Sequence, residues 1–173
     1  MDISLLSQSS IKIRGKTGSL IVDPEDAMPK NNADGVLFQN PKSQAGVLRV
    51  LDCRIFVHGM GDYEVSGIKI SAVGGRENLV YRLTVDEVSI LLTKATEIVK
   101  DDKINSCDIL LLNVDSNFDE SMVAKIDPKI TILYGAGTKE ALKQLGKENT
   151  AAVKKFSTAK DKLPAEMEVI VLN

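Results

Sequence analysis

The chain has 173 residues, and its 22 Lys and Arg against 24 Asp and Glu give a formal net charge of -2 with a single histidine. The hydrophobic (43%) and charged (27%) fractions exclude a disordered polyelectrolyte, and the near-neutral charge argues against a general nucleic-acid binder. The length predicts a single domain over residues 1–173. The sequence has no run of 18 apolar residues and no signal-peptide pattern, so we expect no membrane partner and a cytoplasmic location.

Short runs rich in β-branched residues, separated by glycine and proline turns, predict that the first half of the chain is mainly β-structure. Between the strands we expect a polar loop over Glu25–Ala33 and a short helix over Ser43–Leu51. The expected strands are Ile3–Leu6, Ile11–Arg14, Ser19–Val22, Gly35–Phe38, Arg54–Val57, Tyr63–Val65, Ile68–Ala72, Leu79–Val85 and Val88–Leu92.

The last third of the chain changes to longer apolar runs that alternate with short helical patterns. Continuous apolar runs over Ile109–Val114 and Lys129–Tyr134 predict strands that are covered on both faces. Many strands followed by βαβα units indicate an α+β or layered α/β fold. The remaining expected segments are a helical turn at Thr96–Lys100, helices at Asp119–Lys125 (capped by Asn117 or Asp119) and Thr138–Leu145, a polar, weakly helical segment at Asn149–Lys162 and a strand at Val169–Leu172.

Side chains suited to metal binding or nucleophilic catalysis are scarce. Zinc sites use His and Cys ligands, whereas this chain has one histidine, His58, and two separated cysteines, Cys53 and Cys107, without a CxxC pair. Both cysteines lie in apolar runs, which favours buried thiols. His58 ends an apolar strand beside glycines, so it is either a structurally satisfied histidine or a general acid/base at a strand end. We therefore expect no metal and no cofactor.

The segment Gly135–Lys139 (Gly-Ala-Gly-Thr-Lys) is the most phosphate-like motif of the sequence. It follows an expected strand and opens an expected helix, so its backbone N–H groups are candidates for binding an anion. It matches neither GxxxxGK[ST] nor GxGxxG. The alternative is a tight turn before a helix capped by Thr138. The weaker Gly74–Arg76 pattern indicates a loop.

Several segments form a recognisable set when they are taken in chain order. They are Leu20–Pro24 (hydrophobic-Asp-Pro), Asp34–Phe38 (Asp-Gly-Val-Leu-Phe), Gly59–Ile70 (Gly-x-Gly-Asp-Tyr-Glu-x-x-Gly-hydrophobic), the hairpin Asn78–Leu92, Cys107–Leu111 and Ile126–Ile130. This ordered set resembles the metallo-β-lactamase superfamily, most closely its compact hydrolase-like branch. The resemblance implies an α/β fold: a shortened four-layer αββα sandwich, with two sheets packed face to face and helices outside.

The defining His-x-His-x-Asp-His motif of that family is not matched. The corresponding stretch puts these residues at the four ligand positions: Asn40, Lys42, Gln44 (or Ser43, if the register slips by one) and Ala45. The family's later metal ligands fall near Ala72–Gly75, Lys94–Ala95 and Tyr134–Gly135. Di-metal hydrolysis needs metal to activate water, so the resemblance implies the fold without that activity.

Three functions from different classes remain open. The first is a non-catalytic, metal-free binding or structural protein. The second is a metal-independent enzyme or small-anion binder that uses the vestigial cleft, meaning the position of the family's metal site, with Asn40, Lys42, His58, Lys94 and Tyr134 as candidate residues. The third is a nucleic-acid partner, against which the net charge and the few aromatic residues weigh.

The expected helices are few and short for a four-layer sandwich. Uncovered sheet faces would expose apolar surface, which usually marks a site of association. We therefore expect a homodimer or another homo-oligomer.

Overall fold

The computed structural model describes residues 1–75, 77–97, 106–114 and 118–173. The strands of this part of the chain are β1 (Asp2–Leu5), β2 (Ile11–Arg14), β3 (Ser19–Val22), β4 (Asn31–Asn32), β5 (Gly35–Leu37), β6 (Val50–Leu51), β7 (Ile55–Val57), β8 (Gly61–Val65), β9 (Ile68–Gly74), β10 (Leu79–Val85), β11 (Val88–Lys94), β12 (Ile109–Asn113), β13 (Ile130–Tyr134), β14 (Ala152–Val153), β15 (Lys155–Ser157) and β16 (Glu168–Leu172). The helices are α1 (Glu120–Ile126), α2 (Thr138–Gln144) and the 3-10 turns η1 (Val47–Arg49) and η3 (Lys160–Lys162).

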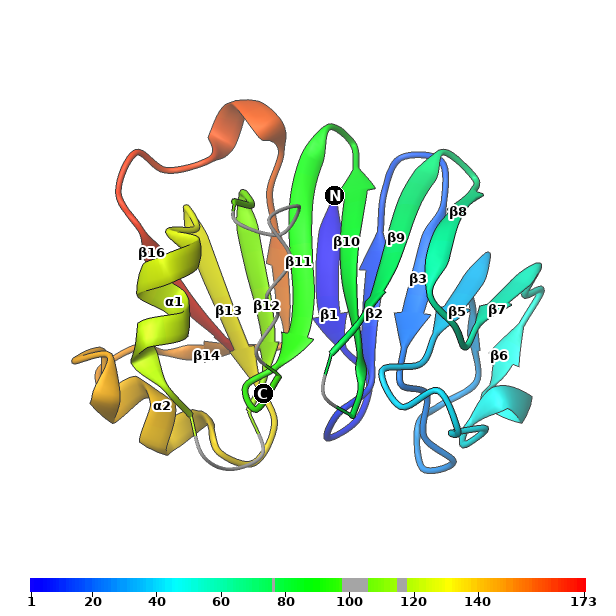
Figure 1. Cartoon of the computed structure of the whole chain (residues 1–173), viewed down its shortest axis with the longest axis horizontal. Helices are drawn as coiled ribbons and strands as arrows, with labels where there is room; N and C mark the ends of the chain where they lie inside the picture. The colour runs from blue at the N-terminus through cyan, green and yellow to red at the C-terminus, as the bar shows by residue number, and fades with distance from the viewer. Residues whose placement is uncertain (76, 98–105, 115–117) are drawn as a thin grey trace.

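These strands form two large sheets. One has the order β15-β1-β2-β3-β5-β7 and the other the order β14-β16-β13-β12-β11-β10-β9-β8. Within them β3, β5 and β7 are parallel, and so are β11, β12 and β13, whereas β8 to β11 form an antiparallel meander. Figure 1 shows α1 and α2 beside β12, β13 and β16 at one end of the molecule, with β6 and β7 at the other.

Three hydrophobic clusters fill the spaces between the layers. The largest lies between the two sheets and joins residues such as Ile13 of one sheet to Leu83 of the other. The second packs Val123 of α1 and Leu142 of α2 against the outer face of the eight-stranded sheet. The third covers the outer face of the six-stranded sheet with residues of the loop after β3, including Met28. The two sheets therefore share one aliphatic core and each has a second apolar face.

The predicted α/β sandwich of two facing sheets is confirmed, and of the four expected layers the described residues place α-helices only outside the eight-stranded sheet. In the described residues, the outer face of the six-stranded sheet is covered by the β3–β5 loop and by β6. The helix expected over Ser43–Leu51 is wrong, because this segment holds only η1 and β6. Gly46 interrupts it: its φ is +66°, and a Cβ there would lie 2.4 Å from the carbonyl carbon of Pro24. The close approach to Pro24 requires a glycine here, and the positive φ of this glycine is not compatible with a right-handed helix.

The C-terminal segment also differs from the expectation. Asn149–Lys162 was expected to be weakly helical, and this prediction is wrong, since the segment forms β14, β15 and η3. β15 pairs with β1, and Lys155 Nζ lies 2.7 Å from Asp2 Oδ2. Long-range pairing overrides the local preference of a polar sequence here.

The helices are short, and their caps are partly as predicted. Asp119 caps α1, because its Oδ1 accepts a hydrogen bond from Ser121 N (2.9 Å). The N-cap of α2 is Gly137, so the prediction of Thr138 as its cap is wrong. The alternative cap Asn117, the turn Thr96–Lys100 beyond Glu97, and Arg76 lie outside the described residues. In the parts of the chain that the structure describes, no helix is long and apolar enough to cross a membrane.

Tyr81 of β10 ties the two sheets together through hydrogen bonds. Its hydroxyl is buried and donates to the carbonyl oxygen of Phe38 (2.6 Å), just after β5 of the opposite sheet, with Val57 O of β7 at 3.3 Å. Burial, with the nearby Asp23 carboxylate as a second cause, raises the pKa of Tyr81 above its ordinary value, so the phenol stays protonated as a donor.

Replacing Tyr81 with Phe is expected to lower the free energy of unfolding by about 1–3 kcal/mol, because buried carbonyl groups lose their donor. Urea denaturation measures the effect. Tyr63→Phe is the matched control: its hydroxyl donates to Gly59 O (3.1 Å) at a partly exposed turn, and we expect a loss below about 1 kcal/mol. Equal losses in the two variants would contradict the inter-sheet role of Tyr81.

Candidate functional site

The carboxyl ends of the parallel strands in the two sheets meet at one edge of the sandwich. Asp23 follows β3, Gln39 lies just beyond β5, and Lys94, Asn113 and Tyr134 end β11, β12 and β13. In layered α/β folds such edges carry ligand sites, because the loops after the strands converge there. We call these five residues the carboxyl-end cluster.

Gln39 is the centre of the cluster. It is fully buried, and its backbone N–H donates to Asp23 Oδ1 (2.7 Å) while its carbonyl oxygen accepts from Leu79 N (2.7 Å). Its side-chain amide is oriented by its neighbours: the NH₂ group donates to Asp23 Oδ2 (3.0 Å), and the oxygen accepts from Lys94 N (3.2 Å). Gln39 therefore links the six-stranded sheet to both β10 and β11.

Asp23 contributes a buried carboxyl group. Burial raises its pKa to about 6, against the opposing effects of the hydrogen bond from Gln39 and the charge of Lys94. Asp23 also adopts a left-handed backbone conformation (φ +44°), and its N–H donates to Leu37 O (2.9 Å). The chain thus turns sharply at this residue and aims the carboxyl group at Gln39.

Lys94, Asn113 and Tyr134 form a row across the ends of three parallel strands. They are paired in register, and the residues two positions earlier in each strand belong to the core between the sheets. Side chains alternate between faces, so all three point to the inner side. Adjacent strands lie about 4.8 Å apart, which puts the backbones of Lys94 and Tyr134 about 10 Å apart.

Tyr134 is unusual within this row. Its side chain is fully buried, and its hydroxyl has no hydrogen-bond partner among the described residues. Burial, followed by the nearby Asp23 carboxylate, raises the pKa of Tyr134 well above its ordinary value, so the group remains a neutral phenol. A buried hydroxyl without a partner is rare in folded proteins, which makes this position a candidate for contact with a water molecule or ligand.

The structure does not bring His58 into the carboxyl-end cluster. The imidazole stacks on Phe38, with ring centroids 4.4 Å apart and an interplanar angle of 10°. Phe38 belongs to the outer cluster of the six-stranded sheet, on the face opposite the core between the sheets. With Gln44, Leu48 and Phe56, His58 instead lines a separate hollow of about 410 Å³. The structure thus supports the interpretation of His58 as a packed strand-end histidine.

Asn40 and Lys42 lie in an exposed loop after β5. The Oδ1 atom of Asn40 accepts from Lys42 N (3.0 Å), which closes a local turn. Of the five candidate residues from the sequence, the structure therefore brings only Lys94 and Tyr134 together on the inner face. It adds Asp23 and Gln39, whose position directly after short apolar strands is the signal that points to them.

The Gly135–Lys139 segment makes a tight turn. Gly135 has a φ of +101°, and a Cβ there would lie 2.6 Å from Val114 O. The N–H of Gly137 already donates to Val114 O (2.8 Å). These contacts favour the turn interpretation over an anion site.

The donor set at the carboxyl-end cluster does not suit zinc. It offers one carboxyl group, two amides, an ammonium group and a phenol, whereas zinc prefers His, Cys and paired carboxylates. Within the described ranges, no group of three or more His, Cys, Asp or Glu side chains is placed to hold a metal ion.

Comparison with known proteins finds solved structures with a similar overall fold. No protein-family model and no curated protein sequence matches the chain. A candidate Zn-dependent hydrolase of the metallo-β-lactamase superfamily from Thermotoga maritima matches with a TM-score of 0.80 at 17% identity, over 99% of this chain and 97% of that chain. The chain has the metallo-β-lactamase fold.

Two further structures with this fold agree. An isothiocyanate hydrolase from Delia radicum gut bacteria matches with a TM-score of 0.60 at 9% identity, over 91% of this chain and 99% of that one. The metallo-β-lactamase fold protein YhfI from Bacillus subtilis matches with a TM-score of 0.58 at 9% identity, over 97% and 95%. At these identities the likeness defines the metallo-β-lactamase fold and leaves the activity to be argued from the site.

The buried Asp23 carboxyl group predicts a pH effect on stability. Its folded pKa of about 6 lies above the ordinary 3.8, so the folded state holds the proton more tightly than the unfolded state. The protonated Asp23 therefore stabilises the folded state in full below about pH 4, and this stabilisation is lost as the pH rises through about 6. At about 1.4 kcal/mol per pH unit between the two values, the loss amounts to about 3 kcal/mol.

The measurement is the free energy of unfolding of the wild type minus that of Asp23→Asn, at several pH values from about 4 to 7. In this difference the contributions of the other titrating groups cancel. The cost of placing an Asn amide opposite Gln39 is constant, so it does not affect how the difference changes with pH. We expect the difference to become less favourable to the wild type as the pH rises. A flat difference would contradict the assignment.

Proposed function

We propose that this chain is a metal-independent, non-catalytic protein with the metallo-β-lactamase fold, acting as a binding or structural module. One observation carries the proposal: the edge where the two sheets' parallel strands end is closed by the hydrogen bonds of Gln39 to Asp23 and to the backbone of Lys94. At this edge Gln39, Asp23 and the backbone of Lys94 satisfy one another, and the described side chains supply no set of converging metal donors.

The residues at the family's ligand positions support the same proposal. By the resemblance, the first ligand positions hold Asn40 and Lys42, and both side chains are exposed in a loop. The later positions fall near Lys94 and Tyr134, which offer an ammonium group and a phenol. An ammonium group repels a metal cation, so Lys94 disfavours metal binding by charge as well as by donor type.

The names of structural neighbours include a candidate Zn-dependent hydrolase and an isothiocyanate hydrolase. A hydrolase that uses metal-activated water would need ligands that the carboxyl-end cluster does not supply.

Elemental analysis of the purified protein tests the proposal. We expect substoichiometric zinc, iron and manganese, and a melting temperature that neither EDTA nor added Zn²⁺ changes, because only a ligand that binds the folded state stabilises it. The matched variant carries Asn40→His, Lys42→His, Gln44→Asp and Ala45→His, which restores the family's first motif. One or two zinc ions per wild-type chain would refute the proposal, whatever the variant does.

A second candidate function, small-anion binding, is favoured by Tyr134. Its buried hydroxyl lacks a partner and shares a row with Lys94, and both groups are hydrogen-bond donors. Inorganic phosphate is the probe: a rise in melting temperature that Lys94→Met abolishes would favour this function over a purely structural one.

A further inference from the structure

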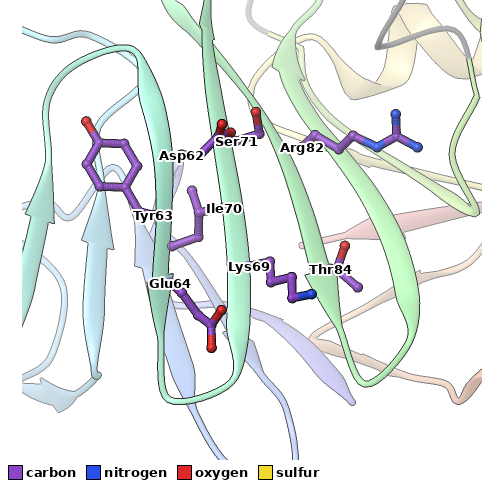
Figure 2. A pocket seen from close by; sticks show the side chains of 8 residues that line it. All are labelled: Asp62, Tyr63, Glu64, Lys69, Ile70, Ser71, Arg82 and Thr84. Atoms are coloured by element: carbon purple, nitrogen blue, oxygen red, sulfur yellow. The ribbon is translucent and has the colours of Figure 1, made fainter.

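The outer face of β8, β9 and β10 is built differently from the rest of the eight-stranded sheet. Beside it, β12 and β13 pack their outer face against α1 and α2 through an apolar cluster. Away from Val73 and Val80, which join that cluster, the outward side chains of β8 to β10 are polar, and they line a hollow of about 430 Å³. Figure 2 shows Asp62, Ser71 and Arg82 side by side across the three strands. Ile70, which precedes Ser71, is 2% exposed and belongs to the core between the sheets.

The strand register arranges these polar side chains in two rows. Asp62, Ser71 and Arg82 are paired partners across β8, β9 and β10. Two residues away along each strand, Glu64, Lys69 and Thr84 form the second row. Both acidic residues therefore lie on β8, and the two basic residues lie on β9 and β10. The four charges sum to zero, and the face is a dipole directed across the strands.

The charges of Asp62, Glu64 and Lys69 are not paired within the described part of the chain. The described ion pairs of 4.0 Å or less involve other side chains. Within the described ranges these three charges are exposed on the face of the sheet and available to a second molecule, and the charge pattern decides which one.

We propose that this face is a homotypic interface, in which two copies of the chain pack face to face around a two-fold axis parallel to β9. Such an axis exchanges β8 with β10 and keeps each residue at its level along the strands. Asp62 then meets Arg82 of the partner subunit, and Arg82 meets Asp62 of the partner subunit. Lys69 lies next to the axis opposite its own copy, so each Lys69 side chain turns away from the axis toward Glu64 of the partner subunit.

The charge pattern favours a second copy over an unrelated partner. An isologous interface requires a surface that is complementary to itself, and a dipole of two acids and two bases meets this condition when it is rotated by 180°. A uniformly acidic or basic face would repel its own copy. Because the interface is polar and only three strands wide, its association is reversible and weakens as salt screens the charges.

The face lies on the outer side of the eight-stranded sheet, whereas the carboxyl-end cluster points to the inner side. The sequence predicted a dimer from exposed apolar sheet faces, whereas the part of this face that is exposed among the described residues is charged.

Sedimentation equilibrium with charge-reversal variants tests the interface. We expect Asp62→Arg and Arg82→Asp each to weaken self-association at least about tenfold, because each turns two attractive contacts into repulsive ones. The double variant Asp62→Arg/Arg82→Asp restores both pairs and the wild-type dissociation constant. An equimolar mixture of the two single variants forms a heterodimer, because the opposite charges again face each other.

The control is Asp161→Arg on η3, an exposed reversal away from the face, which should leave the dissociation constant unchanged. Arg82 also interacts within its own chain, so the melting temperature of each variant is recorded, and the salt dependence of the wild type from about 50 to 500 mM NaCl gives a readout without mutation. A wild type that stays monomeric at high micromolar concentration would overturn the proposal. So would single variants that associate like the wild type, or a double variant that remains dissociated.

Discussion

The arrangement of the two sheets at their carboxyl-terminal edge depends on Gln39. This residue is completely buried, and each of its four hydrogen-bonding groups has a partner: two on Asp23, one at Leu79 and one at Lys94. A buried amide without partners would cost several kcal/mol. The geometry that satisfies Gln39 therefore fixes the end of β5 against β10 and β11, and it determines where the neighbouring side chains of the cluster lie.

The ionisation of Asp23 follows from the same contacts. With both carboxylate oxygens accepting from Gln39, the charged form gains hydrogen bonds, yet burial raises its pKa to about 6. Desolvation is therefore the larger effect, and the charge of Lys94 only reduces it. Tyr134 experiences the same surroundings: it is buried near Asp23, and its hydroxyl remains without a described partner. At this edge the hydrogen-bonding groups of Gln39 are all paired, whereas the Tyr134 hydroxyl has no described partner. The structural and the anion-binding proposals therefore concern the same few residues.

The sequence predicts most of the strands, because alternation and continuous apolar runs are local signals. Ile11–Arg14, Leu79–Val85 and Ile130–Tyr134 all form strands within a residue or so of their expected bounds. The errors have long-range causes. Gly46 is held by contact with Pro24, about twenty residues earlier, and β15 depends on pairing with β1 at the other end of the chain. No local pattern reports such contacts.

The candidate site was predicted less well than the fold for a related reason. A motif alignment names positions, and it cannot tell on which side of a strand a side chain lies. His58 and Lys94 both end apolar runs. The period of two puts His58 on the outer face of the six-stranded sheet and Lys94 on the inner face of the eight-stranded sheet, so only Lys94 joins the inner row. Asp23 and Gln39 each follow a buried strand of three or four residues, but their partnership needs the register of β3 with β5. That register is a property of the folded sheet.

The same period explains why the eight-stranded sheet has two kinds of outer face. β12 and β13 are buried along their whole length and carry α1 and α2, whereas β9 alternates between buried and exposed residues. A sheet covered on both faces needs apolar residues throughout, and a sheet open on one side needs the alternating pattern. The exposed outward positions of β8 to β10 accordingly lie where no helix of the described residues packs on the sheet. Their outward charges lie where a covering helix would require apolar side chains, and the ordering of those charges by strand gives this face the symmetry that the proposed dimer uses.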